Sequence, residues 1–408
     1  MEQPNLALIP SGYKTAKVYS VLPESGVGDL IFDRSNNTAT RINKDGIIES
    51  VAADIPRLNY EVTNGVVDSC PHLLLEMNST NSITYSNDLS QTVWAGAGFN
   101  NAVYGQVGVN GTLNAWLFTK TGASNSDFYN TAFTGTYTFS FFVKKEANKG
   151  VKIYNFGDTT QQSTINIETG TYVAGVNTVT IKEFPNNWLR VAQTLTISNG
   201  KYYLYVSDGT TTQIASSIVV QYFQIEEESY ATSYIPTSGS TQTRATESCT
   251  RAGDVNTFNS VEGILYAELK RDIATDTGFR RVVIDNANNN LENTVRLGYS
   301  TVTNEIKGVV TVGGVTQCAL VFAGLSVTSF RKMALLYKAN QFELWVDGSK
   351  RAEDTSGSTF PINTLNNLSF EQANGSDKLR AKVKDVRYYD TDGMSNTEIT
   401  NLLTQLTQ

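Results

Sequence analysis

The chain has a single histidine, His72, which stands two residues after Cys70. Alternate positions on a strand point the same way, so the pair could form a nucleophile with its base or two metal ligands. A nucleophilic device also needs a group that orients the base, and zinc needs further Cys or His ligands, which this stretch lacks. We therefore expect a buried thiol and a packed or rim histidine here.

Two carboxylates, Glu343 and Asp347, are the nearest match to the acid pair of a glycosidase. Their spacing places both on one face of a strand, where such a pair could flank a sugar. However, Asp347 is followed by Gly348, and this dipeptide is typical of a two-residue hairpin turn. Because the turn explains the pair, we predict no catalytic residue and no enzyme.

An acidic run, Glu226-Glu-Glu228, follows an apolar strand pattern. Calcium takes several oxygen ligands, so Glu226 is a candidate metal ligand. A solvated strand end is the simpler explanation of the run. No EF-hand spacing is present. Ca²⁺ is the one candidate cofactor, and we expect no other.

Sugar binding needs an exposed aromatic ring beside amide or carboxylate groups. Of the four tryptophans, Trp188 and Trp345 lie inside strand patterns, and we expect them in the core. Trp94 and Trp116 flank a Gly- and Asn-rich stretch, so they are the candidate carbohydrate-binding residues. Burial in the core is the alternative for these two as well.

Composition limits the classes of partner. The net charge is -7 and the basic residues are scattered, so we expect no nucleic-acid partner. No stretch approaches the ~18 apolar residues of a membrane span, and Met1 to Gly12 has no secretory signal pattern. The three cysteines lie far apart, which indicates folding in a reducing cytoplasm.

The elements that must position these residues are short strands. A length of 408 residues suggests about two or three domains, and only 17% of the residues are charged. Thr, Ser, Asn and Gly supply the polarity instead, as on exposed strand faces and turns. Strand patterns separated by Gly, Asn and Asp turns occur at 137–143, 202–206, 217–225, 263–269, 333–337 and 342–346.

One helix is expected, with Ser395 as its N-cap and Glu398 at capping-box spacing. The predicted fold is mostly β, with two antiparallel β-sandwiches behind an irregular N-terminal segment. The predicted domains are an N-terminal segment at 1–84, a first sandwich at 85–236, a Thr/Ser-rich linker at 237–254, and a second sandwich with the terminal helix at 255–408.

Ordered short motifs in the N-terminal segment resemble the adaptor region of bacteriophage tail and head-fibre proteins. They are Leu8-Ile-Pro-Ser-Gly-Tyr-Lys14, Asp33-Arg-Ser35, Ala39-Thr-Arg-Ile-Asn-Lys-Asp-Gly46, Ile55-Pro-Arg-Leu-Asn-Tyr60 and Cys70-Pro-His-Leu-Leu-Leu-Glu76. The resemblance implies that this segment docks onto other virion proteins.

Two further resemblances cover most of the remaining chain. Residues 135–144, 187–190 and 224–239 look like the carbohydrate-binding-type jelly roll that follows that adaptor. Residues 342–348, 365–370 and 381–390 resemble the laminin-G, concanavalin-A-like fold. Such domains often hold a cation at a loop rim, which makes Asp385, Asp390 and Asp392 candidate ligands.

Together these features predict a bacteriophage virion protein, a tail or head fibre or spike, made in the bacterial cytoplasm and carried on the virion. Its sandwiches would bind host-surface or environmental glycans, and the resemblance implies a homo-oligomer, a trimer or a dimer. A non-adhesive capsid decoration or fibre stalk is the first alternative. A polysaccharide depolymerase is the second, because two carboxylates suffice for that chemistry.

Overall fold

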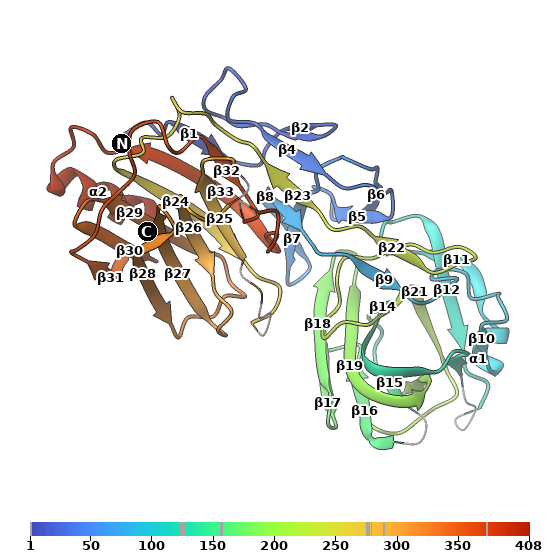
Figure 1. The fold of residues 1–408 in the computed structure, drawn as a ribbon. Coiled ribbons are helices and arrows are strands. Elements are labelled where there is room, and N and C mark those ends of the chain that lie inside the picture. The colour runs from blue at the N-terminus through green and yellow to red at the C-terminus, as the bar shows by residue number, and fades with distance from the viewer. Residues whose placement is uncertain are drawn as a thin grey trace.

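The computed structural model describes residues 2–122, 127–155, 158–274, 278, 280–288, 290–372 and 374–408. Within these ranges the chain is mostly β, and its antiparallel sheets form two sandwiches with the N-terminal segment lying across both (Figure 1). The predicted fold class is confirmed. No helix in the described ranges is long and apolar enough to cross a membrane.

The first sandwich consists of two six-stranded sheets. In sheet order, one contains β10 (Trp94–Ala95), β13 (Phe128–Tyr129), β20 (Tyr202–Ser207), β15 (Gly150–Asn155), β16 (Asp158–Asn166) and β17 (Thr171–Ala174). The other contains β11 (Val103–Val107), β12 (Leu113–Thr119), β21 (Ser217–Glu226), β14 (Phe133–Lys144), β19 (Trp188–Gly200) and β18 (Thr178–Phe184). Apolar residues of both sheets share one core, as the alternating pattern of the strands predicts. The one-turn helix α1 (Ala97–Asn100) adds Phe99 to that core.

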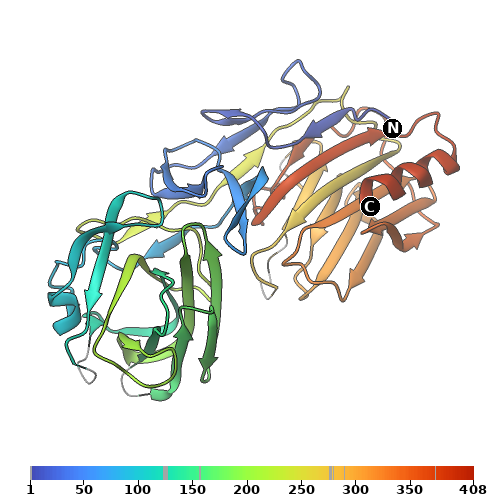
Figure 2. The ribbon, with the colours of Figure 1, turned by 180° about the vertical axis from the view of Figure 1, so that it is seen from behind.

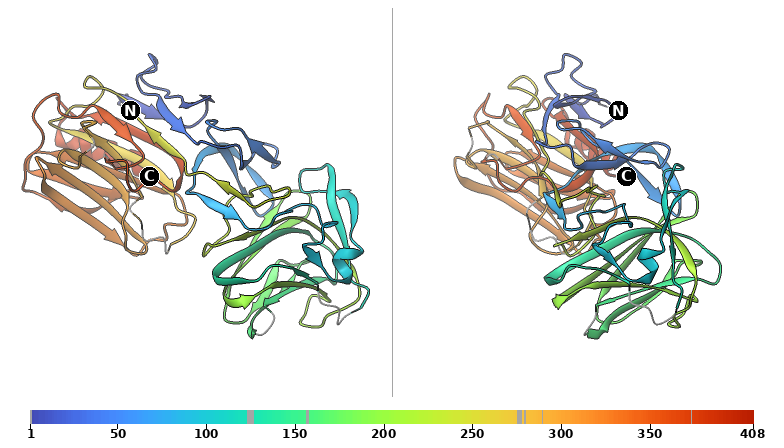
Figure 3. Two further views of the ribbon diagram at one scale, coloured as in Figure 1. Left: turned by 45° about the vertical axis from the view of Figure 1, so that its right-hand side comes forward. Right: turned by 90° about the vertical axis from the view of Figure 1, so that its right-hand side faces the viewer.

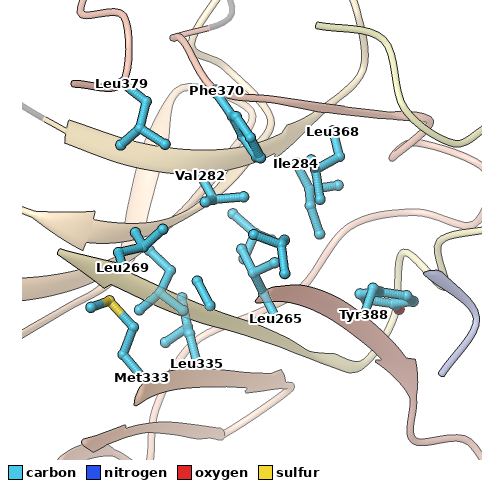
Figure 4. Packing of buried hydrophobic residues seen from close by; sticks show 14 of the residues in the cluster. Leu265, Leu269, Val282, Ile284, Met333, Leu335, Leu368, Phe370, Leu379 and Tyr388 are labelled. Atoms are coloured by element: carbon cyan, nitrogen blue, oxygen red, sulfur yellow. The ribbon is translucent and has the colours of Figure 1, made fainter. Parts of the chain in front are cut away.

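The second sandwich packs an eight-stranded sheet against a five-stranded sheet. The eight-stranded sheet runs β31 (Ser349–Asp354), β30 (Gln341–Val346), β29 (Arg331–Lys338), β24 (Gly263–Lys270), β33 (Ala381–Asp390), β8 (Val66–Leu75) and β7 (Leu58–Thr63), with β1 (Leu6–Leu8) also pairing β33. The five-stranded sheet runs β28 (Val315–Ala323), β27 (Glu305–Val312), β26 (Thr294–Tyr299), β25 (Arg280–Asp285) and β32 (Asn367–Ser369). Figure 4 shows Leu265 and Leu335 of one sheet meeting Val282 and Ile284 of the other.

The predicted helix is present as α2 (Asn396–Thr407), which begins after the N-cap Ser395 with a complete capping box. Ile399, Leu402 and Leu403 are buried against the outer side of the eight-stranded sheet. Seen from behind, α2 lies across the strands of the second sandwich, near the C-terminus (Figure 2). The sheet is therefore covered on both sides, by the core on one and by α2 on the other.

The N-terminal segment is built into both sandwiches. Its strands β1, β7 and β8 complete the eight-stranded sheet, so both chain ends lie on the second sandwich (Figure 3). Smaller sheets are formed by the strands β2 (Tyr13–Lys14), β3 (Lys17–Val18) and β4 (Leu30–Asp33), and by the pair β5 (Ala39–Ile42) and β6 (Ile48–Val51). Against the first sandwich, Val62 of this segment joins a buried cluster with Phe142 and Trp188. The predicted core position of Trp188 is confirmed.

The stretch predicted to be a linker is ordered by pairing with the N-terminal segment. Strand β22 (Gln242–Arg244) pairs with β9 (Ser79–Asn81), and β23 (Ser248–Thr250) pairs with β4. Arg244 and Glu247 are 0% and 1% exposed. The linker interpretation is therefore wrong, because Thr and Ser that look flexible in sequence serve here as β-strand residues. The first sandwich is inserted between two halves of one larger unit.

Candidate functional site

Strand β20 alternates two kinds of side chain. Leu204 and Val206 are 1% and 0% exposed and belong to the core. Tyr203 and Tyr205 stand at the alternate positions and point away from that core, but they too are buried, at 9% and 3% exposed. The sequence Tyr202-Tyr-Leu-Tyr-Val206 thus places two phenol rings on the side of the sheet away from the core, where neighbouring side chains such as Lys120 and Phe128 cover most of both.

The register of the sheet brings more aromatic side chains beside these rings. Tyr203 pairs with Phe128 of β13 on one side and with Tyr154 of β15 on the other. The ring centroids lie 4.8 Å apart for Phe128 and Tyr203, and 5.3 Å apart for Tyr203 and Tyr154. Tyr154 also stacks on Tyr205 at 5.3 Å. We call these four residues, Phe128, Tyr154, Tyr203 and Tyr205, the tyrosine row.

Amide and hydroxyl groups continue the same face. Tyr154 pairs with Gln162 of β16, and Thr164 of β16 pairs with Val173 at the edge of the sheet. Two hollows of about 270 and 340 Å³ lie side by side there, since Thr164 and Val173 line both. Phe128 and Tyr154, the two partly exposed rings of the row, therefore lie on the same face as neutral hydrogen-bonding groups, and sugar recognition needs both kinds of group.

A hydrogen bond joins two tyrosines of the row. The hydroxyls of Tyr154 and Tyr205 are 3.0 Å apart. Burial and this hydrogen bond raise the pKa of Tyr154 well above its ordinary value. The Lys120 ammonium lies 4.2 Å from the Tyr205 ring centroid and 2.8 Å from an oxygen of Asp127. The Tyr154 hydroxyl therefore stays protonated at neutral pH and can donate a hydrogen bond.

The structure corrects the expectation that Trp94 and Trp116 offer open ring faces. Trp94 is 2% and Trp116 7% exposed, and both pack in the core of the first sandwich. Their indole Nε1 atoms donate to backbone carbonyls, that of Trp94 to Tyr85 at 3.0 Å and that of Trp116 to Asn87 at 2.9 Å. Burial, the alternative for both, accounts for them. The sequence interpretation overlooked Phe128 and Tyr154, whose rings are partly exposed.

The candidate metal ligands lie apart from one another in the fold. Glu226 is fully buried and accepts hydrogen bonds from Ser79 and Thr232. Asp385 pairs with the guanidinium of Arg387. Among the residues that the structure describes, no three His, Cys, Asp or Glu side chains group as metal ligands.

The third candidate ligand, Asp390, forms hydrogen bonds with the loops at the end of β33. It accepts hydrogen bonds from Asn259 Nδ2 at 2.8 Å and from the amide of Asp392 at 2.9 Å. These donors occupy the oxygen Oδ1, so its role in the structure is to hold the turn after β33 against the segment that precedes β24. Asp390 and Asp392 therefore act together in a turn.

The residues that resembled catalytic pairs have structural roles. Asp347 and Gly348 have φ of 46° and 76°, and they join the paired residues Val346 and Ser349, so the predicted turn is confirmed. Glu343 accepts a hydrogen bond from Trp345 Nε1 at 2.8 Å. Trp345 is 7% exposed beneath α2, which confirms its core position.

His72 and Cys70 do not form a site together. His72 is fully buried, with Nε2 3.1 Å from Asn59 Nδ2, as expected for a packed histidine. Burial and the nearby Lys382 lower its pKa well below the ordinary value, so the ring is neutral. Cys70 is exposed, and the prediction of a buried thiol is wrong because the first half of β8 projects beyond the core.

A further cavity lies where the N-terminal segment and both sandwiches meet. This cavity of about 300 Å³ is lined by Glu61 together with three lysines. Oxygens of Glu61 lie 2.9, 3.2 and 3.4 Å from the ammonium groups of Lys382, Lys182 and Lys270. Because these lysines come from different parts of the chain, Glu61 holds the parts together, and we interpret the cavity as a structural junction.

No protein-family model and no curated protein matches this sequence. Among solved structures, it is similar to the CBM40 module of the Ruminococcus gnavus IT-sialidase bound to alpha2,3 sialyllactose, at 14% identity over 36% of this chain and 83% of that one (TM-score 0.30). It is also similar to domains LG4-5 of the mouse laminin alpha1 chain, at 10% identity over 80% of this chain and 90% of that one (TM-score 0.24). It is similar as well to the tandem CBM22 domains of Paenibacillus barcinonensis Xyn10C, at 10% identity over 78% of this chain and 99% of that one (TM-score 0.23). Likenesses this weak carry no argument about function.

Proposed function

We propose that this protein is a non-catalytic virion component, a bacteriophage fibre or spike, that binds surface glycans through the outer face of its first sandwich. The observation that carries glycan binding is the tyrosine row, which runs into the amide and hydroxyl groups of β16. A pyranose ring presents an apolar face and a rim of hydroxyls, so it needs these two kinds of group side by side.

The N-terminal segment is the proposed attachment surface. Its motifs resemble phage adaptor regions, and it carries exposed apolar side chains at Ile9, Tyr19, Val21, Val27 and Ile31, each 36–46% exposed. Exposed apolar groups that gather in one segment indicate a protein contact. The same segment is fixed to both sandwiches, so a docked N-terminal segment would hold the glycan-binding face in a defined orientation.

The glycan-binding part is tested with an array of bacterial surface polysaccharides, followed by titration calorimetry with the strongest binder. Replacing Tyr154 by alanine removes the half-buried ring at the centre of the row and is expected to weaken binding by about tenfold. Tyr104→Ala is the matched control, because Tyr104 is 55% exposed on β11 in the opposite sheet. Equal affinities of the Tyr154 variant and the wild type would place any glycan site elsewhere.

The virion part is tested by gold-labelled antibodies on intact phage particles in the electron microscope. Label on the tail or on projecting fibres supports the proposed fibre. Label over the head would favour a capsid decoration, and unlabelled particles in a lysate rich in the protein would refute the virion assignment. Light scattering of the purified protein measures the proposed trimer or dimer, in which several copies strengthen weak sugar contacts by avidity.

A further inference from the structure

Cationic side chains outnumber acidic ones in the cavity of about 300 Å³ where the N-terminal segment and both sandwiches meet, which we call the junction cavity. Five lysines and arginines line it, against three glutamates and aspartates. Ion pairs account for four of the five cations: Glu61 holds the three lysines, and Arg41 pairs with Glu49 at 2.7 Å. The cation that these pairs leave over is Arg190 of β19.

The register of the first sandwich places Arg190 between a second cation and an aromatic ring. Arg190 pairs with Lys182 of β18 on one side and with Phe142 of β14 on the other. The three side chains therefore share one face of the sheet, and all three line the junction cavity. Like charges directly opposite each other destabilise a sheet. Burial and the nearby Lys382 also lower the pKa of Lys182, so this wall of the cavity is short of negative charge.

Among the residues that the structure describes, no carboxylate forms an ion pair with Arg190. Its Nη2 donates to Ser140 Oγ at 3.2 Å, whereas its Nε is buried and has no hydrogen-bond partner. Glu226 and Glu76 attract Arg190 electrostatically, but hydrogen bonds and ion pairs with other residues hold both carboxylates. A buried donor without an acceptor is costly, and a bound anion would remove that cost.

Apolar side chains form another part of the cavity wall. Ile42 and Ile48 pair across the β5–β6 hairpin, and both pack with Phe142 and Phe184 of the first sandwich. All four line the junction cavity, whose volume lies at the lower end of the range for small-molecule pockets. An inorganic ion would gain nothing from this wall, whereas an organic anion would bury apolar surface against it.

We propose that the junction cavity binds a small organic anion, whose carboxylate lies against the Arg190 guanidinium and whose apolar body faces Ile42 and Ile48. A guanidinium presents its N–H donors in a planar fork that matches the two oxygens of a carboxylate. The unpartnered Nε would donate one of these hydrogen bonds. The bound carboxylate would also offset the repulsion between Arg190 and Lys182, so the ligand should stabilise the folded protein.

The test is calorimetric titration of the full-length protein with benzoate, which carries one carboxylate on an apolar ring. One molecule per chain should bind, with a dissociation constant of about 1 mM or lower. Benzyl alcohol is a neutral molecule of similar size, and inorganic phosphate is an anion without an apolar body. Each should bind at least about tenfold more weakly than benzoate.

Arg190→Gln removes the guanidinium and should weaken benzoate binding at least about tenfold. Without benzoate, its melting temperature should equal or exceed that of the wild type, because Arg190 has no ion pair to lose and its repulsion from Lys182 disappears. A purely structural arginine would instead lower the melting temperature when it is replaced.

A second variant places a fixed negative charge in the cavity. Ile48→Glu changes a partly exposed position of β6 that lines the cavity, and repulsion should abolish benzoate binding. Arg351→Gln is the matched control for Arg190→Gln, because this exposed arginine lies on β31 of the second sandwich. Its affinity for benzoate should equal that of the wild type.

Three results would each overturn the proposal. Absence of benzoate binding up to about 10 mM would mean that the cavity is a junction only. Equal affinity for benzoate and phosphate would reduce the site to unselective anion binding, and equal affinity for benzoate and benzyl alcohol would remove the role of charge. Wild-type affinity in Arg190→Gln and Ile48→Glu would place benzoate elsewhere. None of the probes is a glycan, so the result does not depend on the proposed function.

Discussion

Glu247 is the residue whose removal should damage the fold most clearly. It lies in the stretch between the sandwiches and is 1% exposed. Its Oε1 accepts hydrogen bonds from Arg34 Nη1 at 2.9 Å and Arg57 Nε at 2.7 Å, and its Oε2 contacts Arg57 Nη2. The backbone amide of Glu76 also donates to Oε2, at 3.0 Å. One carboxylate therefore fixes two buried arginines of the N-terminal segment.

The expected loss in the free energy of unfolding follows from the contacts that Arg34 and Arg57 keep after Glu247 is changed to alanine. Arg34 and Arg57 are both 0% exposed, so their charges cannot reach water in the folded state. Arg57 would keep a pair with Glu76 at 2.8 Å, whereas Arg34 would be left with backbone carbonyls and no carboxylate among the described residues. Breaking a buried ion pair from one side costs about 3–5 kcal/mol, because an uncompensated charge stays buried. We expect Glu247→Ala to lower the free energy of unfolding by that amount.

The assay is urea denaturation of the full-length protein, followed by both tryptophan fluorescence and circular dichroism. Glu353→Ala is the control: its pair with Lys350 is exposed, at 53% and 40% of the two side chains, so the loss should stay below about 0.5–1 kcal/mol. A Glu247→Ala variant as stable as this control would refute the argument that the supposed linker is bound to the N-terminal segment. A change in the slope of the transition would indicate that the two sandwiches unfold separately.

Three further predictions concern the junction and the terminal helix. Burial alone would raise the pKa of Glu61, but Lys382, Lys182 and Lys270 outweigh it and lower the pKa, so the stabilising effect is present above the ordinary glutamate value of 4.5 and is lost at lower pH. Glu61→Gln should therefore lower the melting temperature most at pH 7, and its difference from the wild type should shrink steadily as the pH falls below 4.5; a difference that does not change with pH would contradict this. Ser395→Ala removes the capping box and should cost about 1 kcal/mol in chemical denaturation, against no change for Thr397→Ala two residues on. Leu403→Ala empties a fully buried position on the inner face of α2 and should cost about 2–5 kcal/mol; a loss below 1 kcal/mol would show that the helix contributes little to the second sandwich.

Local patterns determined much of this protein. Alternation along the chain indicated the strands, because side chains on a strand point to opposite faces at every second residue. Ser395 and Glu398 marked the start of α2, and Asp347-Gly348 marked a hairpin turn, because each signal acts over a few residues. These features need no knowledge of the rest of the fold.

Long-range pairing decided the remaining features. The partner of β23 is β4, more than 200 residues earlier, so a Thr- and Ser-rich stretch could pass for a linker in sequence. Likewise, only the register of β13, β20, β15 and β16 brings Phe128, Tyr203, Tyr154 and Gln162 into one line.

The burial of individual side chains could not be predicted from local sequence patterns either. Trp94 and Trp116 were candidate sugar-binding rings in the sequence, but both lie inside the core. The sequence by itself determined which residues form strands, turns and the helix, because those preferences depend on near neighbours. The tertiary structure alone decided which faces stay open, because a strand has two faces and packing selects the one that meets water.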